Sequence, residues 1–126
     1  MRAIDTNVLV RLIARDDDRQ VVAAEGFVAK GAWVSLLALA ETTWVLAAVY
    51  ERSTTEIATA VEMLLDHKNL TVEDSEVVAG ALAIFRKRPA LGFSDCLLIE
   101  LARKVGHLPL GTFDRELSRV AGAVKL

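Results

Sequence analysis

The chain opens with Met1-Arg2-Ala3-Ile4-Asp5-Thr6-Asn7, and this stretch decides which fold class the rest of the sequence must fit. The apolar pair Ala3 and Ile4 predicts a short buried strand ending at Asp5. The acid then lies at the carboxyl end of a strand, which is where open α/β sheets place their chemistry. A carboxylate beside a core is costly unless it is paired or binds a metal ion. The opening therefore predicts an α/β protein whose first strand is followed by an acid that is either a metal ligand or a helix cap or exposed strand-end acid.

Strands and helices are expected to alternate along the rest of the chain. The first strand, Arg2–Asp5, is followed by expected strands at Trp33–Val34, Leu70–Val72, Leu108–Thr112 and Ala123–Lys125. Between them, apolar spacing near 3.6 residues predicts helices at about 8–13, 18–30, 37–52, from 54, 75–85 and 95–104. This alternation predicts a three-layer α/β/α sandwich with a central, mostly parallel sheet of four to five short strands.

Polar residues before several helices predict where those helices begin. We expect Thr6 or Asn7 to cap the first helix and Ser94 to cap the helix that starts at Asp95. Ser53 is followed three residues later by Glu56, which is the spacing of a capping box. Asp16 to Asp18 form a polar break, which we interpret as a solvated loop.

Composition limits the class of protein. A chain of 126 residues predicts one domain, residues 1–126, large enough to bury a core. It is 53% hydrophobic with a mean hydropathy of +0.37, so some apolar surface is expected to serve a partner. We expect no membrane segment and no signal peptide, because the apolar stretch 32–40 is short and Asp5 interrupts the opening. The single cysteine, Cys96, suits a reducing cytoplasm and is expected in the core.

The charge distribution is more informative than the net charge of −2. Seven basic residues lie between Arg86 and Arg119, against four acidic ones. One interpretation is a positive patch that follows a phosphate backbone. The other is that these are ordinary solvated helix faces.

Three later acids, like Asp5, stand beside apolar stretches. Glu41 shares a helical stripe with Leu37 and Trp44, which predicts that its carboxylate faces the core. A buried structural ion pair is the alternative explanation of this pattern. Asp95 falls in the first turn of a helix, where the helix dipole alone also favours an acid. Asp114 follows an expected strand, where a helix cap is the alternative.

Together the four acids predict a bound cation. Carboxylates about 4 Å apart repel by roughly 4 kcal/mol per pair at an effective dielectric near 20. Such a cluster raises its own pKa values or recruits a cation. Oxygen ligands select hard ions such as Mg²⁺ or Mn²⁺, and an ion of this kind suits phosphodiester hydrolysis.

Four motifs in this order resemble the PIN-domain ribonucleases. They are Ile4-Asp5-Thr6-Asn7-Val8-Leu9, the helical Glu41, Phe93-Ser94-Asp95, and Leu110-Gly111-Thr112-Phe113-Asp114. The closest resemblance is to the VapC-type toxins of toxin–antitoxin pairs, and it covers essentially the whole chain. It implies an α/β/α sandwich and Mg²⁺- or Mn²⁺-dependent endonucleolytic cleavage of RNA.

The resemblance also implies roles for individual residues. The catalytic acids would be Asp5, Glu41, Asp95 and Asp114, with the metal held by Asp5, Asp95 and Asp114. The residues that support the site or contact substrate would be Thr6, Asn7 and Thr112. Some members carry another Asp two residues beyond the fourth acid, where this chain has Glu116, whose role stays open. The family further implies a homodimer and a small antitoxin that covers the active-site groove.

Two other classes compete with the nuclease. A phosphoacceptor receiver-like signalling domain is also α/β with an acidic Mg²⁺ site. It would need a lysine near its last strand, and none lies between Lys104 and Lys125. A non-catalytic module that keeps the PIN fold is the other alternative, and the intact acids argue against it. We expect no catalytic role for His67 or His107.

Overall fold

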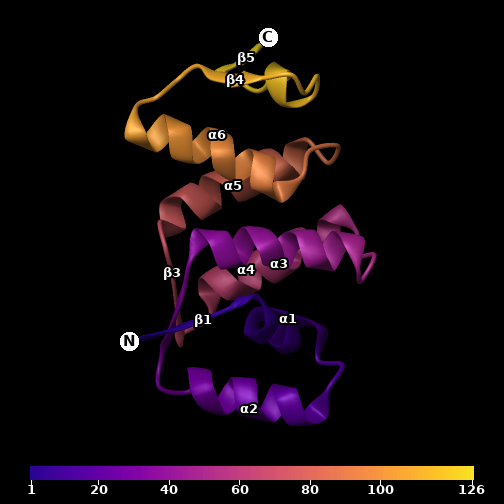
Figure 1. Cartoon of the computed structure of the whole chain (residues 1–126), viewed down its shortest axis with the longest axis vertical. Helices are drawn as coiled ribbons and strands as arrows, with labels where there is room; N and C mark the ends of the chain where they lie inside the picture. Colours follow the sequence, from indigo (N-terminus) through magenta and orange to yellow (C-terminus); the bar gives the residue numbers. More distant parts are fainter. The chain divides into compact units, whose positions relative to one another are not determined.

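The computed structural model describes all 126 residues and shows the predicted alternation of strands and helices (Figure 1). The strands are β1 (Arg2–Ile4), β2 (Ala32–Val34), β3 (Leu70–Val72), β4 (Leu110–Thr112) and β5 (Ala123–Lys125). The helices are α1 (Thr6–Ala14), α2 (Asp18–Val28), α3 (Leu36–Ala48), α4 (Thr54–Asp66), α5 (Ser75–Lys87) and α6 (Phe93–Val105), with a 3₁₀ turn η1 (Leu117–Arg119). Every strand pairing is parallel, in the orders β1-β2-β3 and β4-β5. The predicted α/β fold with short parallel strands is confirmed.

The chain divides into two compact units, Met1–Ser75 and Glu76–Leu126, and each is described by itself. The first contains the three-stranded sheet with α1 to α4 and the first residue of α5. The second contains the rest of α5, α6, η1 and the β4-β5 pair. The single domain expected over residues 1–126 stays a prediction. None of the helices combines the length and apolarity that crossing a bilayer requires.

The core of the first unit forms where the parallel sheet meets its helices. Ala32 and Val34 on the central strand are fully buried, whereas Trp33 between them is exposed, as the alternation of strand side chains requires. The helices contribute the largest buried side chains, which are Leu9, Leu39, Leu46 and Leu64. Helix α1 packs against both α2 and α3, and α3 packs against α4. This packing fixes α1, which begins directly after the acid at the end of β1.

Two predicted helix caps are wrong, and one is confirmed. Asp5, not Thr6 or Asn7, caps α1: its Oδ1 accepts a hydrogen bond from the Val8 amide at 3.2 Å. Its backbone is still extended, whereas Thr6 is already helical. The N-cap of α6 is Gly92 rather than Ser94, because the helix begins one residue earlier, at Phe93. The predicted box at the start of α4 is present, with Ser53 and Glu56 each bonding to the other's backbone amide.

Helix α3 buries a different face from the predicted one. The stripe expected in the core is exposed, with Leu37 at 71% and Trp44 at 66% exposure and Glu41 also at the surface. The buried face instead carries Thr42 and Thr43 among its apolar residues. Their hydroxyls donate to backbone carbonyls within the helix, at 2.7 and 2.8 Å, which removes the cost of burying them. The helix also ends at Ala48, not at Arg52.

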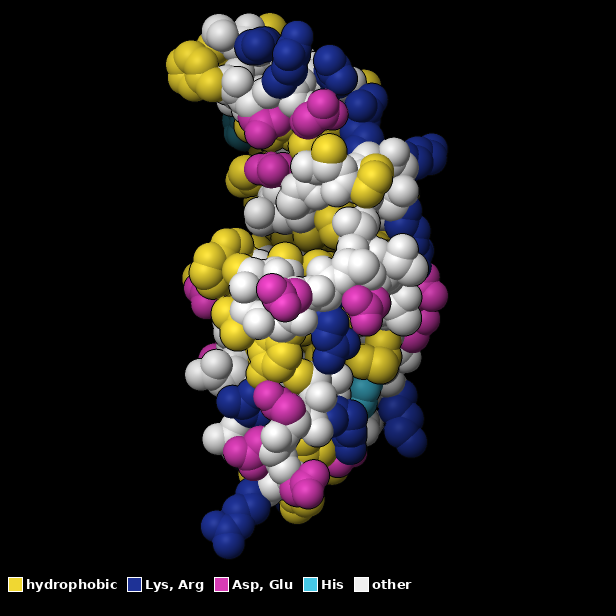
Figure 2. All heavy atoms as spheres, turned by 90° about the vertical axis from the view of Figure 1, so that its right-hand side faces the viewer, with side chains coloured by type: hydrophobic (Ala, Val, Ile, Leu, Met, Phe, Trp, Pro, Cys, Tyr) yellow, Lys and Arg dark blue, Asp and Glu magenta, His cyan; other side chains and the backbone are white.

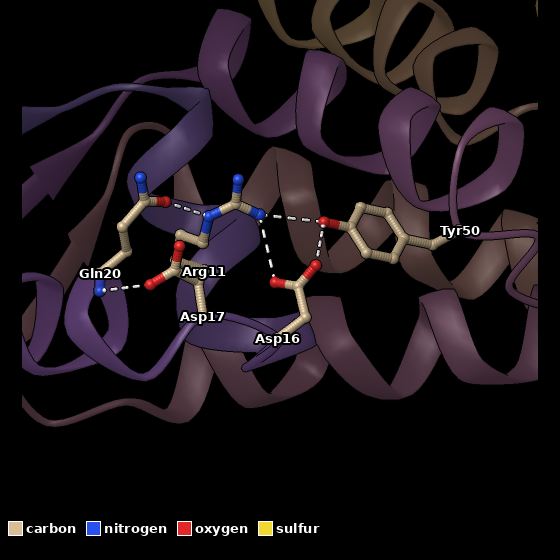
Figure 3. A network of polar contacts seen from close by, with 5 residues as sticks. All are labelled: Arg11, Asp16, Asp17, Gln20 and Tyr50. Atoms are coloured by element: carbon tan, nitrogen blue, oxygen red, sulfur yellow. Dashed lines mark hydrogen bonds and ion pairs between the residues drawn. The ribbon is translucent and has the colours of Figure 1, made fainter.

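A polar network holds the far end of α1 (Figure 3). Arg11 donates from Nη1 to the Tyr50 hydroxyl at 3.0 Å and to Asp16 Oδ1 at 3.2 Å, and Tyr50 donates to Asp16 Oδ2 at 2.9 Å. The side-chain oxygen of Gln20 accepts a hydrogen bond from Arg11 Nε, and the Asp17 side chain accepts one from the backbone amide of Gln20. The tyrosine hydroxyl, more than any other group, lowers the pKa of Asp16. The network joins α1, the start of α2 and the residues after α3.

The second unit is built around the contact between α5 and α6. Phe85 and Phe93 meet edge to face, with ring centroids 5.5 Å apart. Gly80 on α5 lies against Glu100 on α6, where an added Cβ would come within 2.7 Å of the carboxylate. The helix α6 is followed by Gly106, whose φ of +80° favours glycine. Strands β4 and β5 pair in register from Leu110 and Ala123 and pack against η1.

Candidate functional site

In the first unit, Thr6 links the acid after β1 to the acid on α3. Asp5 lies exposed at the junction of β1 and α1, held by the Val8 amide. The next residue, Thr6, donates from Oγ1 to Glu41 Oε2 at 3.0 Å. The structure therefore brings Glu41 into contact with the residue that follows Asp5, at the surface of the unit and not on a core-facing stripe. Asn7 is exposed one residue further on.

The start of α3, and with it Glu41, is fixed by two side chains. Ser35 Oγ accepts from the Ala38 amide at 3.0 Å, which caps the helix. Glu73, directly after β3, accepts from the Leu36 amide at 2.8 Å. These bonds satisfy two of the amide groups that a helix start leaves without partners. They anchor the helix one and a half turns before Glu41, next to the carboxyl end of the sheet.

In the second unit, two acids interact directly. Asp95 lies half-buried in the first turn of α6, and Asp114 follows β4. Burial raises the pKa of the Asp95 carboxyl, and the negative charge of Asp114 raises it further, while a bond with the Gly92 backbone opposes both effects. The charged form of Asp95 is therefore disfavoured by its surroundings. This is the property expected of a metal-binding carboxylate when the ion is not bound.

The Asp114 side chain is held by its neighbours in the chain. Its Oδ1 accepts from the Leu117 amide at 2.8 Å, and its backbone amide donates to Thr112 Oγ1 at 2.9 Å. Thr112, one of the predicted supporting residues, thus fixes the turn that carries the acid. Glu116, whose role the sequence left open, lies 3.3 Å from Arg119 Nη1 in an ion pair.

The donor chemistry of both pairs fits a hard divalent ion. The groups at hand are carboxylate and hydroxyl oxygens, which Mg²⁺ and Mn²⁺ prefer. No three or more acidic, histidine or cysteine side chains are close enough together to hold a metal ion by themselves. The structure therefore shows two separate pairs of acids, one in each unit. Asp5 and Glu41 belong to the first, and Asp95 and Asp114 belong to the second.

Cys96, next to Asp95, is not part of the chemistry. Its side chain is fully buried, which confirms the prediction of a small core residue. Burial, with a smaller contribution from the charge of Asp95, raises the pKa of the Cys96 thiol to about 12. A thiol that stays protonated at neutral pH is a poor nucleophile and a poor metal ligand.

A pocket between α1 and α2 was not predicted from the sequence. It encloses about 310 Å³ and is lined by Asn7, Val8, Arg11, Gln20, Ala23, Ala24 and Phe27. The guanidinium of Arg2 stacks on the Phe27 ring, 3.8 Å from its centroid. The only signal in the sequence was the predicted helix break at Asp16 to Asp18, which implies that the two helices turn back on one another. Asn7, which the resemblance implies as a supporting residue, is among the residues that line this pocket.

Comparison with known families identifies this arrangement. The model of the PIN domain family matches residues 3–123, nearly the whole chain, so the protein belongs to that family. No curated protein and no solved structure matches the chain. PIN domains are typically metal-dependent nucleases that bind RNA. Membership in this family also removes the receiver-like signalling domain as an alternative.

Proposed function

We propose that this protein is a metal-dependent endoribonuclease that hydrolyses RNA phosphodiester bonds as the toxin of a type II toxin–antitoxin pair. The observation that best supports this proposal is the match of the PIN family model to residues 3–123, in a chain that holds a half-buried Asp95 in the same unit as Asp114. A half-buried carboxylate beside a second carboxylate destabilises a fold unless a cation compensates it. Retention of such a pair favours a catalytic PIN domain over a non-catalytic module with the same fold.

In this proposal the chain's own residues place oxygen atoms around the reacting phosphate. Asp5, Asp95 and Asp114 would hold Mg²⁺ or Mn²⁺, and Glu41 would complete the catalytic acids. A bound divalent ion supplies charge neutralisation at the phosphate and a water of lowered pKa. Thr112 fixes the turn before Asp114. Thr6 orients Glu41 through its hydroxyl.

The proposed partners are RNA, a small antitoxin and a second copy of the chain, in the cytoplasm. The exposed apolar side chains of α3, Leu37 and Trp44, together with Val49 just beyond it, support association with another protein. Sequencing of RNA ends after expression of the protein in cells would identify the RNA that it cleaves.

The experiment that tests the activity is cleavage of a mixed cellular RNA by the purified protein. We expect cleavage with Mg²⁺ or Mn²⁺, none with chelator, and a loss of more than about 100-fold for Asp5→Asn and Asp95→Asn. Asp66→Asn, the same change on the surface of α4, is the matched control and should leave cleavage unchanged. Full cleavage by Asp95→Asn would show that its assignment as a ligand is wrong.

Two further measurements separate the finer parts of the proposal. Calorimetric titration with Mn²⁺ should show binding that Asp95→Asn weakens, and absence of binding at millimolar ion would favour the non-catalytic module. Induced expression should arrest the growth of bacterial cells, and Asp95→Asn should relieve the arrest. Cleavage without growth arrest would support the nuclease and contradict the toxin.

A further inference from the structure

We propose that Phe113 is a substrate-binding residue that stacks on an unpaired base of single-stranded RNA bound beside Asp95 and Asp114. The inference rests on the proposed function and extends it to how the strand is held. Recognition of single-stranded RNA commonly uses aromatic side chains on which bases stack. The proposal concerns any base, because every base presents a flat face to the ring.

The exposure of Phe113 is unusual for a phenylalanine. Its side chain is 79% exposed, whereas Phe85 and Phe93 in the same unit are buried at 3%. A phenylalanine ring normally buries a large apolar area, so leaving it in water forgoes much of the stabilisation that it could contribute to the fold. The ring lies between Thr112, which fixes the turn through its hydroxyl, and Asp114 itself.

The backbone on each side of the ring is held rigidly. The Asp114 amide donates to Thr112 Oγ1 at 2.9 Å, and the Ser118 amide donates to the Asp114 carbonyl at 3.0 Å. On the strand side, the Leu126 amide donates to the Thr112 carbonyl at 2.9 Å. Moving Phe113 into the core would break these bonds. Because the backbone is already held, stacking of a base restricts only the two side-chain torsions of the ring, which limits the entropic cost of binding.

The charge of this unit favours a nucleic acid over an apolar protein segment. Residues Glu76–Leu126 hold eight Lys and Arg against five Asp and Glu, a net charge of +3. Residues Met1–Ser75 hold seven against twelve, a net charge of −5. Figure 2 shows Lys and Arg side chains gathered over the part of the molecule that carries β4, β5 and η1. Arg115 is exposed directly after Asp114. A ring among basic groups suits a strand whose phosphates need countercharge.

The test measures the affinity of the protein for a fluorescein-labelled oligouridylate of about 12 nucleotides by fluorescence anisotropy. Chelator is present throughout, so that no cleavage occurs. We expect Phe113→Leu, which keeps apolar volume but removes the ring, to weaken binding by about 5- to 100-fold. Phe113→Trp should bind within about twofold of the unchanged protein. Val105→Ala removes apolar surface elsewhere in the unit and should have no effect. Because Phe113 is exposed, thermal unfolding should be the same for all variants.

Several outcomes would overturn the inference. Binding by Phe113→Leu within about twofold of the unchanged protein excludes stacking. Equal loss with Phe113→Trp, in a protein that remains folded, excludes it as well. The inference is also wrong if Phe113→Leu binds RNA as well as the unchanged protein but no longer associates with a co-purifying protein. The ring would then be a protein contact.

The inference and the nuclease proposal can fail separately. If the unchanged protein binds RNA through Phe113 but cleaves none with Mg²⁺ or Mn²⁺, the nuclease proposal is wrong and the stacking role stands. If it cleaves RNA and Phe113→Leu has unaltered binding and the same kcat/KM, the stacking role is wrong and the nuclease proposal stands.

Discussion

Two of the carboxylates in this protein are held by hydrogen bonds from the backbone. Asp5 accepts from the first turn of α1, and Asp114 accepts from Leu117, the first residue of η1. Both bonds come from backbone amides, so they fix the side chain without neutralising its charge. Asp95 differs, because burial and the charge of Asp114 both oppose its ionisation.

The first prediction concerns Asp95 and pH. Its pKa is raised in the folded chain, so the folded state holds the proton more tightly than the unfolded state. The stability contributed by the protonated carboxyl is complete below the ordinary Asp pKa and is lost as pH rises through the raised value. With chelator at pH 7, Asp95→Asn should therefore raise the midpoint of thermal unfolding.

The difference between Asp95→Asn and the unchanged protein should vanish in acid, where both side chains are uncharged. Added Mn²⁺ should stabilise the unchanged protein more than the variant, because the ion compensates the carboxylate. Asp66→Asn is the control for the amide substitution. A lower midpoint for Asp95→Asn at pH 7 would contradict the raised pKa.

At the scale of elements, the signals that act within a few residues were predicted only in part. Ser53 and Glu56 form the expected capping box, whereas Asp5 and Gly92 are the N-caps of α1 and α6 in place of the expected residues. The face of α3 was predicted incorrectly, because a helix that is apolar on nearly every side has no periodicity that selects one face. Thr42 and Thr43 were overlooked as core residues, since nothing in the sequence shows that their hydroxyls bond to their own helix.

The second prediction concerns the cap of α4. Ser53→Ala removes the acceptor for the Glu56 amide, so it should lower the free energy of unfolding by about 1 kcal/mol. Urea denaturation followed by circular dichroism measures the change. Thr59→Ala, in the middle of the same helix, is the control and should be neutral or slightly stabilising, because alanine has the higher helix propensity. Equal destabilisation by both substitutions would mean that the cap contributes nothing of its own.

At the scale of the whole molecule, charge is distributed unevenly between the two units. The net charge of −2 conceals a unit at −5 and a unit at +3. The basic patch predicted between Arg86 and Arg119 lies within the positive unit. A polyanion is therefore expected to bind mainly through residues Glu76–Leu126. Its affinity should fall as the salt concentration rises, because the release of counterions on binding then contributes less free energy.

The third prediction uses this salt dependence. Each phosphate contact with single-stranded RNA contributes a slope of about −0.7 to the dependence of log affinity on log salt concentration. Arg115→Ala should reduce the magnitude of that slope by about 0.7, as measured by anisotropy at several salt concentrations. Lys30→Ala, an equal loss of charge in the negative unit, should leave the slope unchanged. Equal effects of both substitutions would show that net charge, not a local contact, governs binding.

The sequence by itself determined the order of strands and helices, the capping box at the start of α4, and the place of each of the four acids along the chain. These follow from interactions between residues close in the chain, which the pattern records directly. Tertiary structure alone decided which face of α3 is buried, the contact of Arg11 with Tyr50, the coupling of Asp95 to Asp114, and the exposure of Phe113. Each depends on which distant side chain arrives as a neighbour, because burial and electrostatic energy are set by surroundings that no local pattern specifies.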